Sequence, residues 1–103
     1  MNSEVLTLYS RKGCCLCQEL EKKLSNISLK NLKPSLVLSI VDIDSKKVSL
    51  DIQMKYTNQV PVIVLDSTQL LKKIELPRVS PRLKEDMLFS WIQNNLNKLY
   101  QIS

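Results

Sequence analysis

The sequence has few of the features that mark membrane, secreted or nucleic-acid-binding proteins. Its 103 residues include no histidine, one glycine, one phenylalanine and one tryptophan. No apolar run approaches the roughly 18 residues that a transmembrane helix needs. Residues 1–4 lack the basic and apolar regions of a secretory signal. We therefore expect a cytoplasmic protein that does not associate with a membrane.

The chain is basic, with a net charge of +5, but its lysines and arginines are spread along the sequence. Binding of single-stranded nucleic acid usually combines a basic groove with stacking aromatic side chains, which are scarce here. We therefore expect a solvated basic surface and no nucleic-acid partner. The length suits one domain with one core, spanning residues 1–103, and we expect it to be a monomer.

The three cysteines all lie within four consecutive positions, at Cys14, Cys15 and Cys17, directly after the single glycine, Gly13. A secreted disulfide scaffold would spread its cysteines along the chain. A local C-x-x-C pair in a reducing compartment instead indicates catalysis or metal binding. A closed zinc site needs about four ligands, and the chain has no histidine and no second cysteine pair. A metal or iron–sulfur site would therefore need ligands from a second chain or from glutathione, and we expect none.

The apolar pattern predicts an α/β domain with the element order β-α-β-α-β-β-α. The strands are predicted at residues 5–9, 36–41, 61–65 and 69–76. The helices are predicted at residues 14–27, 46–56 and 82–100. Ser45 is expected to cap the second helix, and Ser80 with Pro81 to begin the third.

The element order predicts a four-stranded mixed sheet with helices on both faces. The first strand-helix-strand unit should be parallel, and the closing hairpin must be antiparallel. The second and third strands are nearly continuously apolar, a pattern typical of strands covered on both faces. We therefore expect both of these strands to be central in the sheet.

Three features of the chain resemble the glutaredoxin-like branch of the thioredoxin superfamily. Residues 8–17 (LYSRKGCCLC) are similar to the strand, loop, C-x-x-C and helix that open glutaredoxins, here with a Gly-Cys-x-Leu-Cys sequence. Residues 60–64 (VPVIV) are similar to the strand of the family that begins with a cis-proline facing the dithiol. The element order over residues 4–100 also agrees. The resemblance implies a thioredoxin-like fold.

The resemblance implies a thiol–disulfide oxidoreductase in which Cys14 is the nucleophile and Cys17 the resolving cysteine. The predicted helix N-terminus lies at Cys14, where unpaired N–H groups and the helix dipole stabilise a thiolate. Arg11 and Lys12 add positive charge beside it. We therefore expect the pKa of Cys14 to lie below the value of about 8.5 of a free cysteine.

The resemblance also implies a substrate groove around the dithiol. Val60 would offer its backbone to a bound peptide or thiol beside the cis-proline, Pro61. Arg11 falls where glutaredoxins carry a lysine, and it would attract the carboxylate of glutathione. The remaining substrate-binding residues are predicted beside Pro61 and the dithiol, at Lys12, Arg78, Val79 and Ser80.

The chain departs from glutaredoxins where these bind glutathione. Their Gly-Gly followed by an acidic residue is absent before the last helix, where residues 76–81 read LPRVSP. The expected substrates are protein or low-molecular-weight disulfides, with glutathione as a co-substrate or a thioredoxin reductase as the electron donor, and no bound cofactor. The alternatives are a redox-silent binding or regulatory domain of the same fold, and a domain that binds a metal or an iron–sulfur cluster through its cysteines.

Overall fold

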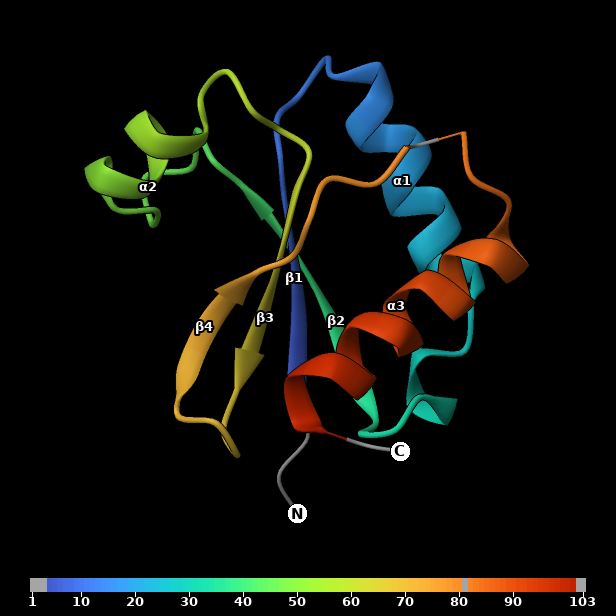
Figure 1. The fold of residues 1–103 in the computed structure, drawn as a ribbon. Coiled ribbons are helices and arrows are strands. Elements are labelled where there is room, and N and C mark those ends of the chain that lie inside the picture. Colours follow the sequence, from blue (N-terminus) through green and yellow to red (C-terminus); the bar gives the residue numbers. More distant parts are fainter. Residues whose placement is uncertain (1–3, 81, 102–103) are drawn as a thin grey trace.

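The computed structural model describes residues 4–80 and 82–101. Within these residues the chain forms the predicted order of strands and α-helices, with one added 3-10 turn, η1 (Figure 1). The elements are β1 (Glu4–Ser10), α1 (Cys15–Asn26), η1 (Leu29–Asn31), β2 (Leu36–Asp42), α2 (Leu50–Tyr56), β3 (Val62–Ser67), β4 (Lys72–Glu75) and α3 (Glu85–Tyr100).

The four strands form one mixed sheet in the order β2-β1-β3-β4. Strand β2 is parallel to β1, and the β3–β4 hairpin is antiparallel to it, as predicted. The expectation that β2 is central was wrong, because β2 lies at the sheet edge. Val37 and Ile40 of this strand are 51% and 39% exposed. The apolar run of β2 therefore reflects partial coverage by α1 and not a doubly covered position.

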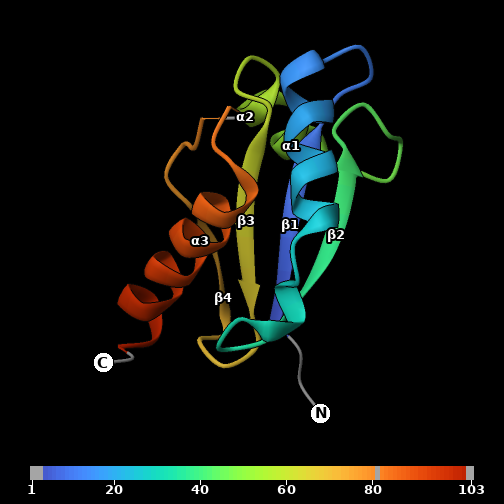
Figure 2. The same ribbon diagram turned by 90° about the vertical axis from the view of Figure 1, so that its right-hand side faces the viewer.

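Helices cover both faces of the sheet, as expected. In Figure 2, α1 and α3 lie in front of the sheet and α2 lies behind it. The larger core lies between α1, α3 and the sheet, and includes Leu6, Leu8, Leu20, Leu24, Leu65, Leu88, Ile92 and Leu96. A smaller cluster lies under α2, where Tyr56 packs with Tyr9, Ile43, Val62 and Val64. Both clusters include side chains of β1 and β3. Packing on both faces of these strands holds the end of β1 in place beside the cysteines.

Two helices begin later than predicted, because the two serines expected as caps stabilise turns instead. The hydroxyl of Ser45 accepts from the amide of Lys47, and Ser49 caps α2 by accepting from the amide of Ile52, at 3.3 Å. The hydroxyl of Ser80 accepts from the amide of Arg82 in a turn. Helix α3 begins at Glu85 with two acidic residues in its first turn, which suit the positive end of the helix dipole. The predicted role of Pro81 lies outside the described residues.

The last strand is shorter than predicted, because residues 68–71 form the β3–β4 turn, which a buried carboxylate holds by hydrogen bonds. Glu4 is fully buried, and its Oε1 accepts from the amide of Thr68 at 3.1 Å, from the hydroxyl of Thr68 at 2.6 Å and from the amide of Gln69 at 3.4 Å. The hydroxyl of Tyr100 donates to Oε2 of Glu4. These bonds join the start of β1, the β3–β4 turn and the end of α3.

Candidate functional site

Three loops converge at one end of the sheet, in the upper part of Figure 1. The first connects β1 to α1 and carries the cysteines. The second connects α2 to β3 and contains residues 57–61, and the third is the extended segment 76–80 after β4. These segments are far apart in sequence, and the sheet order brings them together because β1 and β3 are neighbours.

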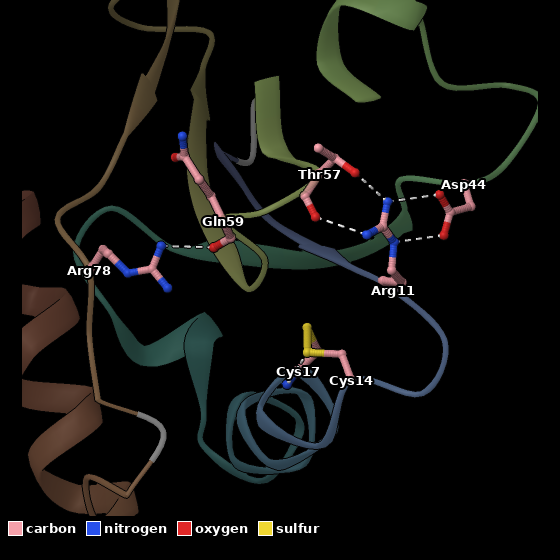
Figure 3. Close-up of a disulfide and its surroundings, with 7 residues drawn as sticks. All are labelled: Arg11, Cys14, Cys17, Asp44, Thr57, Gln59 and Arg78. Atoms are coloured by element: carbon pink, nitrogen blue, oxygen red, sulfur yellow. Dashed lines mark hydrogen bonds and ion pairs between the residues drawn. A yellow bond between two sulfur atoms is a disulfide. The ribbon is translucent and has the colours of Figure 1, made fainter. Parts of the chain in front are cut away.

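The two cysteines of the C-x-x-C pair lie at disulfide distance, with their Cα atoms 5.2 Å apart (Figure 3). Cys14 is the N-cap residue of α1, at the predicted position, and its Sγ accepts a hydrogen bond from the amide of Cys17 at 3.2 Å. Cys14 is partly exposed, whereas Cys17 is 2% exposed. A reagent in solution can therefore reach Cys14 much more easily than Cys17. Cys15 and Leu16, between them, are exposed, and Cys15 is a free thiol.

Gly13 turns the chain from β1 into α1. Its φ of +81° lies in the left-handed region, which residues with a Cβ rarely adopt. The amide of Cys14 closes this turn by donating to the carbonyl of Arg11 at 3.2 Å. The single glycine of the chain is therefore placed where the backbone needs it to present Cys14 at the helix N-terminus.

Arg11 makes a fork of hydrogen bonds to two other loops. Its Nε and Nη2 donate to the carboxylate of Asp44 at 2.9 and 3.1 Å. Its Nη1 donates to the carbonyl oxygen of Thr57 at 2.8 Å, and Nη2 also donates to the hydroxyl of Thr57 at 2.8 Å. A glutathione carboxylate would compete with these bonds, so the predicted role of Arg11 in glutathione binding stays a prediction.

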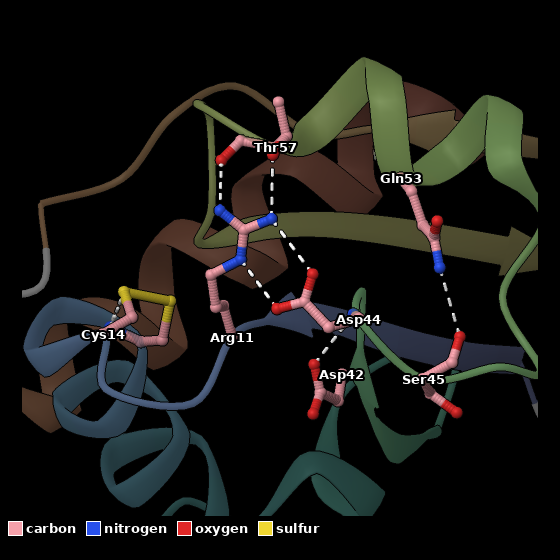
Figure 4. Close-up of polar contacts among 8 residues, drawn as sticks. Arg11, Cys14, Asp42, Asp44, Ser45, Gln53 and Thr57 are labelled. Carbon is pink, nitrogen blue, oxygen red and sulfur yellow. Dashed lines mark hydrogen bonds and ion pairs between the residues drawn. A yellow bond between two sulfur atoms is a disulfide. The ribbon is translucent and has the colours of Figure 1, made fainter.

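The loop that carries Asp44 is itself fastened locally (Figure 4). The amide of Asp44 donates to Oδ1 of Asp42 at 2.9 Å, and the side chain of Gln53 in α2 donates to the carbonyl of Ser45 at 3.2 Å. The sequence did not identify Asp44 or Thr57 as neighbours of the cysteines. Nothing in the local pattern signals an ion pair between residues 33 positions apart.

The segment before Pro61 is held from its other side by Arg78. The Nη1 of Arg78 donates to the carbonyl of Gln59 at 2.8 Å (Figure 3). The Val60–Pro61 peptide bond is cis. The amide of Val60 donates to the carbonyl of Tyr56, at the end of α2, at 3.2 Å. Both the amide of Val60 and the carbonyl of Gln59 are therefore engaged within the protein.

The remaining predicted residues lie on two sides of this site. Lys12 lines a surface cavity of about 340 Å³ together with Cys17, on the side of the dithiol that faces β2. Val79 and Arg78 line a shallow hollow with Pro61 on the opposite side. Ser80 is exposed and belongs to the turn that precedes α3. The structure thus brings Arg78 and Val79 to Pro61 and separates Lys12 from them.

The described residues contain no group of three or more Cys, Asp or Glu side chains arranged to hold a metal ion. The model of the glutaredoxin-like domain family (DUF836) matches residues 5–93. The chain belongs to the glutaredoxin-like domain family. No curated protein matches the sequence.

Solved structures show that this family member shares its fold with thioredoxins. A malarial protein is 19% identical, with a TM-score of 0.60 over 92% of this chain and 99% of its own. A mutant thioredoxin from Halobacterium salinarum is 22% identical, with a TM-score of 0.57 over 90% of this chain and 74% of its own. Mitochondrial thioredoxin 3 from Saccharomyces cerevisiae, in its oxidized form, is 17% identical, with a TM-score of 0.55 over 91% of this chain and 80% of its own.

At these identities the likeness establishes the thioredoxin-like fold alone. It agrees with the predicted α/β architecture, and the match to the family model confirms the predicted family. Within the described residues, no helix has the length and apolar character that crossing a membrane requires.

Proposed function

We propose that this protein is a thiol–disulfide oxidoreductase that uses Cys14 as the nucleophile and Cys17 as the resolving cysteine. The observation that carries the proposal is the unequal exposure of the two sulfur atoms. Cys14 is partly exposed at the N-terminus of α1, and Cys17 is buried one turn further along. An exposed nucleophile and a sheltered second thiol within disulfide reach are what a two-step exchange requires.

In the first step, the Cys14 thiolate attacks one sulfur of a substrate disulfide. The substrate S–S bond breaks, a mixed disulfide forms, and the departing thiolate takes a proton from water. In the second step, Cys17 loses its proton and attacks Sγ of Cys14. The second substrate thiolate leaves, and the Cys14–Cys17 disulfide remains. Two electrons have then passed to the substrate, and an external thiol reductant must return the protein to its dithiol form.

The helix N-terminus supports the first step. Cys14 Sγ already accepts from the amide of Cys17 in the disulfide form. In the reduced form the same amide, together with the dipole of α1, favours the thiolate over the thiol. No acidic residue lies in the first turn of α1, where a negative charge would oppose the thiolate, and Glu19 and Glu21 lie beyond that turn.

The substrate is a protein or small-molecule disulfide that lies across Cys14 and the segment 59–61. Leu16 is 53% exposed beside the dithiol and offers an apolar contact to such a substrate. The electron donor is proposed to be glutathione or a thioredoxin reductase. The engaged side chain of Arg11 favours the reductase, because a glutathione carboxylate would have to displace Asp44 or Thr57.

A turnover assay tests the proposal. The protein is added in catalytic amount to a fluorescent peptide disulfide with dithiothreitol as the reductant. We expect acceleration over dithiothreitol alone and its loss in Cys14→Ser. When reduced Cys17→Ser is freed of dithiothreitol and mixed with the peptide disulfide, we expect an isolable mixed disulfide. Cys15→Ser is the matched control and should turn over like the unmodified protein.

If the protein is fully reduced by dithiothreitol and yet gives no acceleration, the chain is not an oxidoreductase for disulfides. The same fold would then serve as a redox-silent binding domain, and its partner would be sought by capture on the groove. If Cys14→Ser retains full activity, the proposed mechanism is wrong.

A further inference from the structure

We propose that Arg11 is a positioning residue of this exchange reaction, which holds the segment 57–61 at a set distance from Cys14. The inference rests on the proposed function, since it concerns how a substrate is bound beside the nucleophile. It differs from the role that the family resemblance implies for this position, which is direct attraction of a glutathione carboxylate.

The guanidinium joins three loops at one point. Four of its five N–H donors are used, two on the carboxylate of Asp44 and two on Thr57, all at 3.1 Å or less. Asp44 follows β2, Thr57 is the C-cap residue of α2, and Arg11 follows β1. A planar fork of donors suits such a junction, whereas a lysine could not make all four bonds.

The bond to the carbonyl of Thr57 fixes the end of α2. The last carbonyls of a helix lack partners within the helix, and a cation stabilises them. Thr57 is three residues before Val60, and Arg11 is three residues before Cys14. The guanidinium therefore connects the two backbone segments between which a substrate disulfide would lie (Figure 3).

Arg78 holds the same segment from the opposite side. Its bond to the carbonyl of Gln59, at 2.8 Å, lies two residues beyond the Thr57 contact. The segment 57–59 is thus fastened to the β1–α1 loop by one arginine and to the segment after β4 by another. Two anchors on a short loop leave it little freedom to shift relative to Cys14.

The charge of Arg11 is balanced where it lies. The carboxylate of Asp44 contacts it through two oxygens, and this pair is partly exposed. A neutralised, solvent-screened pair attracts an anionic substrate weakly. The contribution of Arg11 is therefore geometric, and it should depend on the shape of the guanidinium and not only on its charge.

This difference can be tested with two substitutions at one position. Arg11→Lys keeps the charge and loses the fork, and Arg11→Met loses both. The matched control is Arg82→Met, which removes an exposed arginine whose side chain makes no ion pair or hydrogen bond with the described residues. Peptide-disulfide turnover gives kcat and KM, and the rate of Cys14 alkylation by iodoacetamide reports the nucleophile itself.

We expect both Arg11 variants to raise KM about tenfold, because a displaced segment 57–61 would bind the substrate more weakly. The value of kcat and the alkylation rate should stay within about twofold of the unmodified protein, because binding before and at the transition state is weakened alike. Arg82→Met should leave KM unchanged. Circular dichroism before each assay establishes that the variants are folded.

Several outcomes would overturn the inference. If Arg11→Lys matches the unmodified protein while Arg11→Met does not, the role of Arg11 is electrostatic. If both match Arg82→Met, Arg11 has no role in exchange. A slower Cys14 alkylation in Arg11→Met would place its effect on the thiolate. By contrast, an unmodified protein that shows no turnover contradicts the proposed function itself.

A second variant keeps the inference testable if the Arg11 variants do not fold. Thr57→Val removes one acceptor of the fork, the hydroxyl, and leaves both the carbonyl and Arg11 in place. We expect KM to rise about threefold, a smaller effect because only one of several hydrogen bonds is lost. An unchanged KM in this variant would count against the inference.

Discussion

The buried carboxylate of Glu4 is expected to stabilise the fold by about 3 kcal/mol at neutral pH. Burial by itself would raise its pKa, but hydrogen bonds from Ser67, Thr68, Tyr100 and Gln69 outweigh burial and lower the pKa from 4.5 to about 2. At about 1.4 kcal/mol for each pH unit, the difference between these two pKa values corresponds to about 3 kcal/mol of folding free energy.

The sign of the pH dependence follows from the lowered pKa. The unfolded chain binds a proton at Glu4 near pH 4.5, whereas the folded chain does so only near pH 2. The stabilisation is therefore complete above about pH 5 and is lost progressively as the pH falls towards 2. Since the side chain is shielded from solvent, water competes little for these hydrogen bonds.

Urea unfolding at pH 7 and at pH 3, followed by the fluorescence of Trp91, measures this contribution. Glu4→Gln keeps the size of the side chain and removes its charge, and we expect the free energy of unfolding at pH 7 to fall by about 2 to 3 kcal/mol. The variant should also lose less stability between pH 7 and pH 3 than the unmodified protein loses. Glu19→Gln, at an exposed position on α1, is the matched control.

The reasoning would be refuted by either of two results. One is a Glu4→Gln variant as stable as the Glu19→Gln control at pH 7. The other is an equal loss of stability between pH 7 and pH 3 in Glu4→Gln and in the unmodified protein, because the acid sensitivity would then come from other carboxylates.

Three further predictions concern the site and its helices. In the reduced protein, mass spectrometry should show faster alkylation of Cys14 than of Cys15 at pH 7, and equal rates would remove the case for an activated thiol. Gly13→Ala should lower the free energy of unfolding by about 1 kcal/mol, because its φ of +81° is unfavourable for a residue with a Cβ. The space around that Cβ is open, so no steric clash adds to this cost. An unchanged free energy in urea unfolding would show that the turn adapts. Ser49→Ala should cost about 1 kcal/mol and Ser45→Ala clearly less in the same assay, and the reverse order would contradict the observed start of α2.

Much of the site could be predicted because its decisive features are local in the sequence. The C-x-x-C pair, the glycine before it and the apolar runs on either side place Cys14 at a strand-to-helix junction without any tertiary information. The periodic apolar residues of α1 and α3 predict which helix faces pack on the sheet. The family resemblance added the expectation that Pro61, at the start of the next strand, faces the dithiol.

The predictions of helix starts and of the central strand were wrong because a residue of a given type can serve in more than one structural setting. Ser45 and Ser80 are good helix caps by type, but each also stabilises a turn, and local pattern does not choose between the two uses. The apolar run of β2 predicted a central strand, yet Val37 and Ile40 are partly exposed at the edge. A run of apolar residues indicates that burial of the strand would be favourable. It does not indicate which elements of the fold lie beside the strand.

The sequence by itself determined the element order, the dithiol and the helix N-terminus that holds it, because these depend on neighbours within a few residues. Only the tertiary structure decided that Arg11 bonds to Asp44 and Thr57, 33 and 46 residues away, and that Glu4 reaches Tyr100, 96 residues away. Hydrogen bonds of this kind form between whichever groups the sheet order brings within about 3 Å, and that order is set by packing of the whole chain.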